Sequence, residues 1–280
     1  MTRTIPHYAA LTRTILRYAA LTVGAAAMVG PFLWMLATSL TTDAQLGDVD
    51  APLVPDPATV EPYGRLGEAF PFWRFAINSL AVASVSTLLQ LVTSATAAYA
   101  FSRLRFRGDN AIFLLYLATM MIPMQVIIVP LFIEMRHLGL VDTYAGLLLP
   151  TVVSSFGVFM LRQAFLALPK ELDEAAFVDG AGHLRVFAQV LLPLVAPALA
   201  TFAVFAFMSS WNAFLWPLVI AQTEAHMTLP VGLSLLQGRY STAWNVVMAG
   251  STVSVLPILA LYVFAQRYVV RGITFTGIKS

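Results

Sequence analysis

The sequence predicts an all-α, polytopic membrane protein with six transmembrane helices. Six long intervals contain no Asp, Glu, Lys or Arg, and they lie at 18–42, 75–102, 110–133, 143–161, 186–223 and 240–266. Only 11% of the residues are charged and the mean hydropathy is +0.80, whereas about a quarter of the residues of soluble domains are charged. A helix needs about 20 apolar residues to cross the hydrocarbon core of a bilayer, so each interval is long enough to span it.

Backbone N–H and C=O groups in lipid must be satisfied within the spanning segment, so each interval is expected to be helical. The short alternating segments of a membrane barrel are absent from the sequence. We therefore predict a single transmembrane domain over 1–280, with spans at about 18–40, 75–100, 110–133, 143–166, 194–220 and 243–266. Prolines in or near five of these spans can kink them and provide hinges.

Two of the intervals allow a second interpretation. Three alanines at 25–27 follow two arginines, which resembles a signal peptide with its cleavage site. The apolar run continues to Leu40, and this length favours a retained anchor. The interval 186–223 is too short for two spans and a turn, which need more than about 40 residues. Pro193 and Pro197 fall near its start, where a loop is expected to lead into one helix.

The distribution of Lys and Arg predicts that both termini lie in the cytoplasm. With the N-terminus inside, 12 of the 16 basic residues fall in cytoplasmic segments and 4 fall in external ones. Cytoplasmic loops carry the excess of basic residues in membrane proteins. We therefore attribute the net charge of +2 to the basic residues that set membrane orientation, and not to nucleic-acid binding.

The longest polar segment, 41–73, is external in this topology. Its acidic residues and prolines favour an extended, irregular loop over a packed domain. A solvated connector is the simpler interpretation of this loop, and a docking surface for an external partner is the alternative.

The sequence contains no recognisable catalytic or metal-binding motif. It has no cysteine, and its four histidines, His7, His137, His183 and His226, lack the spacing of metal ligands. Neither lysine stands in a phosphate-binding loop, and no Gly-x-Ser-x-Gly elbow occurs. If transport here is active, the ATPase must be a separate chain. In that case ATP and Mg²⁺ would bind to partner subunits, and this chain would bind no cofactor.

Several polar side chains interrupt the predicted spans. Polar groups inside a membrane usually face the helix bundle or a water-filled path. Aromatic faces next to amide groups suit a neutral, polyhydroxylated solute, whereas hydrogen bonding between helices is the alternative role. The candidates for a substrate path are Asn78, Gln125, Trp211, Asn212 and Asn245.

The cytoplasmic loop at 167–193, between the fourth and fifth spans, is expected to contain two short helices. Pro169 fits the first turn of one helix, and acidic residues follow it. Gly180 and Gly182 permit a sharp turn, a helical pattern resumes at 183–192, and Pro193 ends the loop. A slim corner of this kind can dock into a groove of a partner, and a solvated amphipathic loop is the alternative.

This loop resembles the signature of the membrane subunits of ABC importers. The pattern Glu-Ala-Ala-x3-Gly-x9-(Ile/Val)-x-Leu-Pro is matched by Glu174, Ala175, Ala176, Gly180, Val190, Leu192 and Pro193. Stretches at 130–132, 138–143, 211–212, 229–233 and 266–270 resemble the carbohydrate, maltose-type branch, and in particular the shorter of its two permeases. Ala213 stands where this branch often has Asp, and the ending at 277–280 also differs.

The resemblance implies the type I ABC importer permease fold and the import of a sugar, a di- or oligosaccharide, across the bacterial cytoplasmic membrane. It implies four kinds of partner: a homologous second permease, two copies of an ABC ATPase, an extracytoplasmic solute-binding protein, and membrane lipid. The chain would not itself be an enzyme. The contact with the ATPase, at 170–185, would include Glu174, Ala175, Ala176, Asp179, Gly180 and Ala181.

Three other functions fit the sequence less closely. A channel or secondary transporter is expected to carry intramembrane ionisable groups, which the six intervals lack. A membrane-embedded enzyme of lipid or glycan metabolism would need clustered acids or histidines. An importer of glycerol-3-phosphate or a related phosphodiester would need a cation or helix N-termini at the midplane. This chain has no Lys or Arg there, although a partner permease could provide one, so a neutral sugar is favoured.

Overall fold

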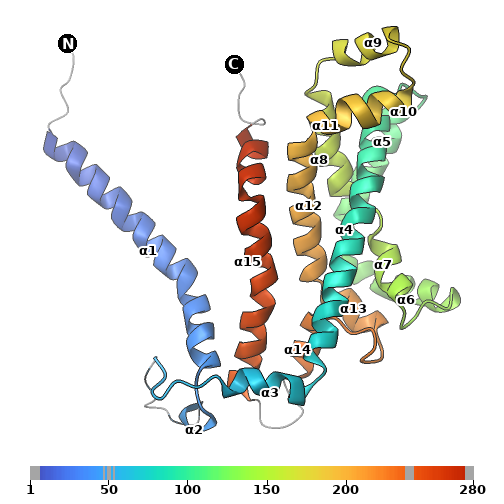
Figure 1. Cartoon of the computed structure of the whole chain (residues 1–280). Helices are drawn as coiled ribbons and strands as arrows, with labels where there is room; N and C mark the ends of the chain where they lie inside the picture. The colour runs from blue at the N-terminus through green and yellow to red at the C-terminus, as the bar shows by residue number, and fades with distance from the viewer. Residues whose placement is uncertain (1–6, 47, 49–51, 53, 237–242, 275–280) are drawn as a thin grey trace. The chain divides into compact units, whose positions relative to one another are not determined.

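The computed structural model describes residues 7–46, 48, 52, 54–236 and 243–274. The described residues form helices joined by loops, and no strand occurs among them (Figure 1). Close packing divides the chain into two units, one comprising 1–70 with 235–255 and the other 71–234 with 256–280. The prediction of an all-α chain is confirmed. The ending at 277–280 lies outside the described residues.

Three long helices are apolar enough to cross a membrane. They are α1 (His7–Ser39), α4 (Phe72–Arg103) and α15 (Trp244–Thr274), and their apolar stretches cover 13–39, 72–103 and 244–266. These stretches overlap the predicted spans at 18–40, 75–100 and 243–266. Pro31 lies inside α1 and Pro257 inside α15 without interrupting either helix.

Two of the other predicted spans are not continuous helices. At 110–133, α5 (Asp109–Ala118) and the 3₁₀ turn η1 (Thr119–Met121) lead to α6 (Met124–His137) through a bend of 100°. Ile122 is extended at this bend because the residue before a proline avoids the helical region. At 143–166, α7 (Tyr144–Leu148) and η2 (Leu149–Thr151) meet α8 (Ser155–Leu166) at 45°.

The predicted span at 194–220 is interrupted as well. A bend of 79° separates 183–194 from α12 (Ala196–Trp211), and Asn212 to Phe214 separate α12 from α13 (Leu215–Ile220). Three of the predicted spans are therefore broken within their length, at 122–123, 152–154 and 212–214, whereas the 79° bend falls where the loop is expected to lead into the fifth span. The first break comes at Pro123, as expected of a proline that kinks a span, but 212–214 contains no proline. If each bent pair of helices makes one crossing, the described residues provide up to six crossings.

The unit at 71–234 is built around α4, α8 and α12, which pack against one another. One buried cluster surrounds the later part of α4 and contains Ala95, Ala98, Tyr99, Leu161, Phe165, Val186, Leu191, Val195, Phe202 and Ala206. A second cluster contains Val82, Met135, Leu147, Trp216 and Ile220. Within this unit, α9 (Glu171–Val178) and α10 (His183–Arg185) lie at one end of α4, and α7 and α13 lie toward the other (Figure 1).

Gly157 allows the three central helices to approach closely. A Cβ atom at this position of α8 would overlap the ring of Phe202 on α12 and the hydroxyl of Ser94 on α4. Well-packed interiors tolerate added methyl groups poorly. This glycine therefore sets the distance at which α8 packs against its two neighbours.

The polar segment 41–73 is more ordered than the sequence suggests. It contains α2 (Asp43–Leu46) and α3 (Glu61–Ala69), so the expectation of an irregular loop is wrong for these residues. Pro62 lies in the first turn of α3, where its missing N–H removes no helical hydrogen bond. Leu66 on the same helix is buried.

Asp43 ties this segment to the beginning of α15. Its carboxylate accepts a hydrogen bond from Nδ2 of Asn245 at 2.8 Å and lies 2.8 Å from Nη1 of Arg65. Nδ2 of Asn245 also donates to the carbonyl oxygen of Thr41 at 3.0 Å. The hydrogen bond from Asn245, followed by that from Arg65, holds the pKa of Asp43 below its ordinary value.

Candidate functional site

The loop between α8 and α12 contains two helices that meet at a glycine. The first helix, α9, ends in a Schellman motif, in which Gly180 N–H donates to Phe177 O at 3.0 Å and Ala181 N–H donates to Ala176 O at 2.9 Å. Gly180 has a φ of +78°, the left-handed conformation that this motif requires. Gly182 is extended and precedes α10. The predicted helix–glycine–helix arrangement is confirmed, and Gly180 makes the turn.

The second half of the loop runs through α10, the π-helix η3 (Val186–Leu191) and α11 (Leu192–Leu194). Pro193 lies in the first turn of α11, and the turn into α12 comes at Val195. The expectation that Pro193 ends the loop is therefore wrong, because proline is accepted in a first turn. Pro169 also lies outside the first turn of α9, which begins at Glu171.

The predicted coupling residues divide into two groups. Ala176 and Ala181 pack against the buried cluster around α4, and they occupy the two positions whose apolar contact accompanies a Schellman motif. The other members, Glu174, Ala175, Asp179 and Gly180, are exposed. Ala176 and Ala181 thus hold the loop against the helix bundle, while Glu174 and Asp179 remain exposed.

Two large apolar side chains in the described part of this loop are strongly exposed. Val178 is 87% exposed and Leu184 is 84% exposed, although both are large and apolar. Large apolar side chains that are this strongly exposed are candidates for contact with a partner. Neither residue is among the predicted coupling residues, yet both stand out in the sequence as apolar positions in a charged loop. We call Glu174, Ala175, Val178, Asp179, Gly180 and Leu184 the exposed loop face.

The end of α4 contacts both halves of the loop. Nε of Arg103 lies 3.0 Å from Oδ2 of Asp173, and both side chains are largely buried. Nη2 of Arg103 donates to the carbonyl oxygen of Leu168 at 3.0 Å. One turn earlier, the Tyr99 hydroxyl lies 3.3 Å from both O and Nδ1 of His183. The sequence identifies Arg103 only as one of the basic residues that indicate orientation. Its contacts with Asp173 and Leu168 could not be predicted from the sequence.

Two of the five candidate substrate-path residues are engaged in packing. Nδ2 of Asn78 donates to the carbonyl oxygens of Ala225 and Met227 at 2.9 Å, and its Oδ1 accepts from Tyr144 at 2.7 Å. The adjacent Ser79 hydroxyl accepts from the first N–H of α14 (Leu229–Leu235). Asn245 is buried and bonded to Thr41 and Asp43. For Asn78 and Asn245 the structure thus favours the hydrogen-bonding alternative over a path.

The other three candidates differ in exposure. Trp211 is buried at the end of α12 and stacks on Phe207, with ring centroids 5.9 Å apart. Asn212 is exposed and donates to the carbonyl oxygen of Met208 at 2.9 Å. Gln125, in the first turn of α6, is also exposed. Asn212 and Gln125 therefore keep polar atoms accessible, as a path requires.

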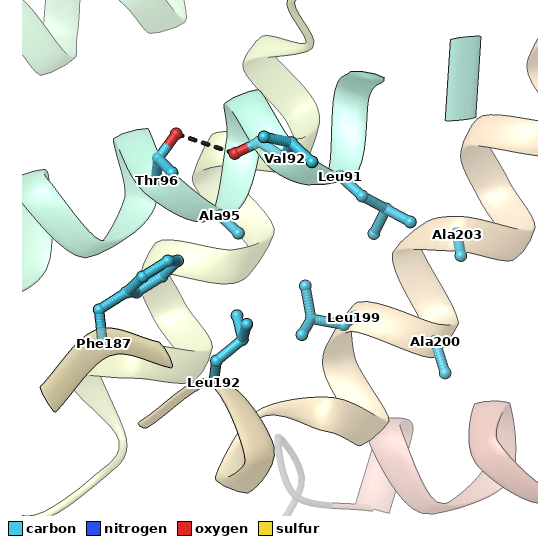
Figure 2. Close-up of a pocket in the computed structure, with 9 residues that line it drawn as sticks. All are labelled: Leu91, Val92, Ala95, Thr96, Phe187, Leu192, Leu199, Ala200 and Ala203. Atoms are coloured by element: carbon cyan, nitrogen blue, oxygen red, sulfur yellow. Dashed lines mark hydrogen bonds between the residues drawn. The ribbon is translucent and has the colours of Figure 1, made fainter. Parts of the chain in front are cut away.

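An apolar pocket of about 340 Å³ lies between α4 and the run of η3, α11 and α12 (Figure 2). Its walls are Leu91, Val92, Ala95, Thr96, Phe187, Leu192, Leu199, Ala200 and Ala203. The hydroxyl of Thr96 is its one polar side-chain group, and it donates to Val92 O at 2.8 Å. A polyhydroxylated solute would find little to bond with here, so we do not assign the pocket to a sugar.

At the other end of the unit, Asp142 holds the loop after α13. Oδ1 of Asp142 accepts from the N–H groups of Gln222 and Thr223 at 3.0 Å, and Oδ2 accepts from the Thr223 hydroxyl at 2.7 Å. Nδ1 of His226 lies 3.3 Å from Oδ1. Burial alone would raise the pKa of Asp142, but these hydrogen bonds and His226 outweigh it and lower the pKa.

The lowered pKa of Asp142 predicts a pH-dependent stability. An ionised carboxylate whose pKa is lowered by folding stabilises the fold above its unfolded value, about 4, and this contribution is lost as the pH falls through the folded value. Asp142→Asn should lower the melting temperature near pH 7, and the difference from wild type should shrink below about pH 4. Asn tolerates the φ of +56° found here. Thermal unfolding in detergent measures the effect, with exposed Glu224→Gln as control. A difference that is constant with pH would contradict the expectation.

Comparisons with known proteins agree with the signature in the loop. Residues 90–275 match the family described as binding-protein-dependent transport system inner membrane component. The chain is 37% identical to the arabinooligosaccharides transport system permease protein AraQ of Halalkalibacterium halodurans, over 90% of this chain and 91% of that one. It is 35% identical to the trehalose/maltose transport system permease protein MalG of Thermococcus litoralis, over 89% and 91%.

The fold also matches a solved transporter. A chain in the crystal structure of a bacterial ABC transporter involved in the import of the acidic polysaccharide alginate superposes with a TM-score of 0.85 at 25% identity, and the match covers 95% of this chain and 99% of that chain. Together with the matched signature and the apolar helices, this likeness confirms the predicted resemblance. The chain therefore belongs to the family of binding-protein-dependent transport system inner membrane components, and it is a multi-pass membrane permease with the ABC importer fold.

Proposed function

We propose that this chain is one of two permease subunits of an ATP-driven importer that moves a di- or oligosaccharide into the cytoplasm. The observation that carries this proposal is the loop at 170–185. It is closed by a Schellman motif, packed onto the bundle through Ala176 and Ala181, and exposed at Glu174, Val178 and Leu184. A rigid corner with apolar tips and acidic charges is suited to docking into a groove of another protein.

In this proposal the loop docks onto a separate ATPase. Binding of ATP would draw the two ATPase subunits together and move the loop of each permease with them. The helices would then alternate between inward-facing and outward-facing states, which requires that ATP and solute bind the two states with different affinities. Glu174 would orient the docked loop and Gly180 would form its corner. ATP and Mg²⁺ would bind to the ATPase subunits.

The placement of basic residues supports an orientation with the loop and both termini in the cytoplasm. An extracytoplasmic binding protein would then deliver solute to the opposite face. The solved relative is a chain of a bacterial ABC transporter, which supports partners of this general kind. Membrane lipid surrounds the spans, and a second, homologous permease completes the translocation path.

Two observations support a neutral saccharide as the solute. The six charge-free intervals contain no Lys or Arg, and the predicted spans include only Arg162, near the cytoplasmic end of 143–166, so this chain offers no cation at the midplane for an anionic solute. The exposed amides of Asn212 and Gln125 can hydrogen-bond hydroxyl groups. The names of the two permease relatives, which specify arabinooligosaccharides and trehalose/maltose, agree with this class, whereas the solved relative belongs to a transporter that imports an acidic polysaccharide.

The experiment that tests the proposal is purification of the tagged chain in a mild detergent, followed by mass spectrometry of the proteins that accompany it. We expect a second permease and an ABC ATPase. A stable homo-oligomer without an ATPase would contradict the proposal and favour a channel.

A pair of asparagine variants separates a path role from a packing role. Asn212→Ala should lower uptake about two- to tenfold without changing assembly, because it removes one hydrogen bond to the solute. Asn78→Ala should instead lower thermal stability and assembly, because it removes the buried amide that donates to the carbonyl groups of Ala225 and Met227 and accepts from Tyr144. Uptake into proteoliposomes and size-exclusion profiles measure the two effects. Loss of assembly in Asn212→Ala would identify Asn212 as a packing residue.

A further inference from the structure

We propose that Arg103 and Asp173 are positioning residues that make α4 and α9 move as one rigid piece, so that movement of the docked loop reaches α4 directly. The chain itself connects α9 to α8 on one side and to η3 and α12 on the other. The link to α4 is made by side chains alone. This inference rests on the proposed coupling role of the loop and adds the route by which its movement enters the bundle.

The guanidinium of Arg103 holds α9 at two points. Arg103 is the last residue of α4, and Asp173 lies in the first turn of α9. The Nε–Oδ2 distance is 3.0 Å, and the two side chains are only 5% and 13% exposed. Nη2 of Arg103 bonds the carbonyl oxygen of Leu168, which precedes α9. The Nε–Oδ2 contact is an ion pair without hydrogen-bond geometry, whereas the Nη2–Leu168 contact is a hydrogen bond. A planar guanidinium reaches both groups at once, which the single ammonium group of lysine cannot do with the same geometry.

Burial decides whether such an ion pair can transmit movement. Exposed ion pairs are screened by water and contribute little, so they would yield when the loop is pulled. A buried pair resists separation because each charge would be left unpaired in a medium of low dielectric. The contact of Tyr99 with His183 supports the second half of the loop, but at 3.3 Å it is longer than a typical O–H···O bond and is secondary.

The side-chain route is also stiffer than the route through the chain. Toward α12 the chain passes the π-helix η3 and a bend of 79°. Toward the opposite end it passes α8, which meets the preceding helix at 45°. In contrast, α4 is one continuous helix from Phe72 to Arg103. Near its other end, Asn78 and Ser79 hold the backbone of 225–229, so α4 connects the loop with the segment after α13.

The test is a distance measurement in the complete importer. The chain has no cysteine, so spin labels can be placed on Leu88→Cys in α4 and Glu171→Cys in α9, both at exposed positions. Double electron–electron resonance is recorded without nucleotide and after trapping with ATP and vanadate. In the labelled protein that is otherwise wild type, we expect the same narrow distribution in both states. In Asp173→Asn we expect the distribution to broaden and to shift on trapping.

Arg103→Lys should keep the charge and the assembly but lose one of the two contacts. Its distance distribution should therefore lie between those of the wild-type protein and Asp173→Asn. The matched controls are Arg162→Lys, an arginine that bonds Phe101 O and covers the Phe113 ring, and Asp109→Asn, an acid in the first turn of α5. Both should behave like wild type.

Two results would overturn the inference. One is a wild-type distance that shifts on trapping, and the other is Asp173→Asn and Arg103→Lys distributions identical to wild type. Failure of the proposed function would look different. In that case Glu174→Lys would leave the amount of co-purified ATPase unchanged, whatever the distance between α4 and α9.

Discussion

Gly180→Val is expected to abolish most ATP-driven uptake while the chain still inserts in the membrane. Gly180 has a φ of +78°, and a β-branched residue is strongly disfavoured there, by about 1–2 kcal/mol or more. Relief of this strain requires the Schellman hydrogen bonds of Gly180 and Ala181 to break. The loop would then lose the geometry that presents Val178 and Leu184. We expect uptake in proteoliposomes to fall at least about tenfold.

Two variants control for the size and the conformation of the new side chain. Gly182→Val places the same side chain two residues later, where the backbone is extended and no atom lies within 4 Å of the new Cβ. It should therefore transport nearly normally. Gly180→Asn should keep much of the activity, since Asn tolerates positive φ. Normal uptake in Gly180→Val would show that the corner is dispensable.

Glu174→Lys is expected to separate ATP hydrolysis from uptake through loss of ATPase docking. Glu174 is exposed on α9 and bonds to no buried partner in the described loop, so the fold should survive the change. Loss of the favourable interaction with the helix dipole accounts for only about 0.3–1 kcal/mol. Reversal of a charge at a protein interface costs several kcal/mol when it faces a like charge. Co-purified ATPase should therefore fall at least about tenfold.

Glu171→Lys is the matched control for this change. Glu171 begins the same helix, is also exposed, and makes the same kind of interaction with the helix dipole. If both variants lose the ATPase to the same extent, general charge rather than the position of Glu174 governs docking. If neither does, the assignment of the loop to the ATPase is wrong.

The corner of the loop could be predicted because its information is local. Ala176, Gly180 and Ala181 lie within six residues and satisfy the sequence rule of a Schellman motif. The long helices α1, α4 and α15 could be predicted for the same reason, since their apolar residues are contiguous. The bend at 122–123 falls at Pro123, one of the prolines expected to kink the spans. Its size of 100° and the break at 212–214 could not be predicted, because charge-free length measures whether a segment can span and gives no information on its bends.

The partners of the polar residues could not be predicted, because they come from distant parts of the chain. Asn78 bonds Ala225 and Met227, which lie 147 and 149 positions later in the chain. Its role as a support for the segment before α14 follows only from the fold. Asn245 bonds Asp43 across 202 positions. The contacts of Arg103 could not be predicted either. A basic residue at the cytoplasmic end of a span is expected from the orientation rule alone. This rule does not reveal that Arg103 is buried against Asp173.

The measurement that tests the account most directly is the amount of solute imported per ATP hydrolysed by the purified importer in proteoliposomes. The solute is the saccharide that the co-purified binding protein carries. Wild-type importer should show uptake that depends on ATP, with a fixed ratio of solute to ATP, and Glu174→Lys should lose both uptake and the ratio. Uptake that proceeds without ATP, or a ratio unchanged in Glu174→Lys, would contradict the account.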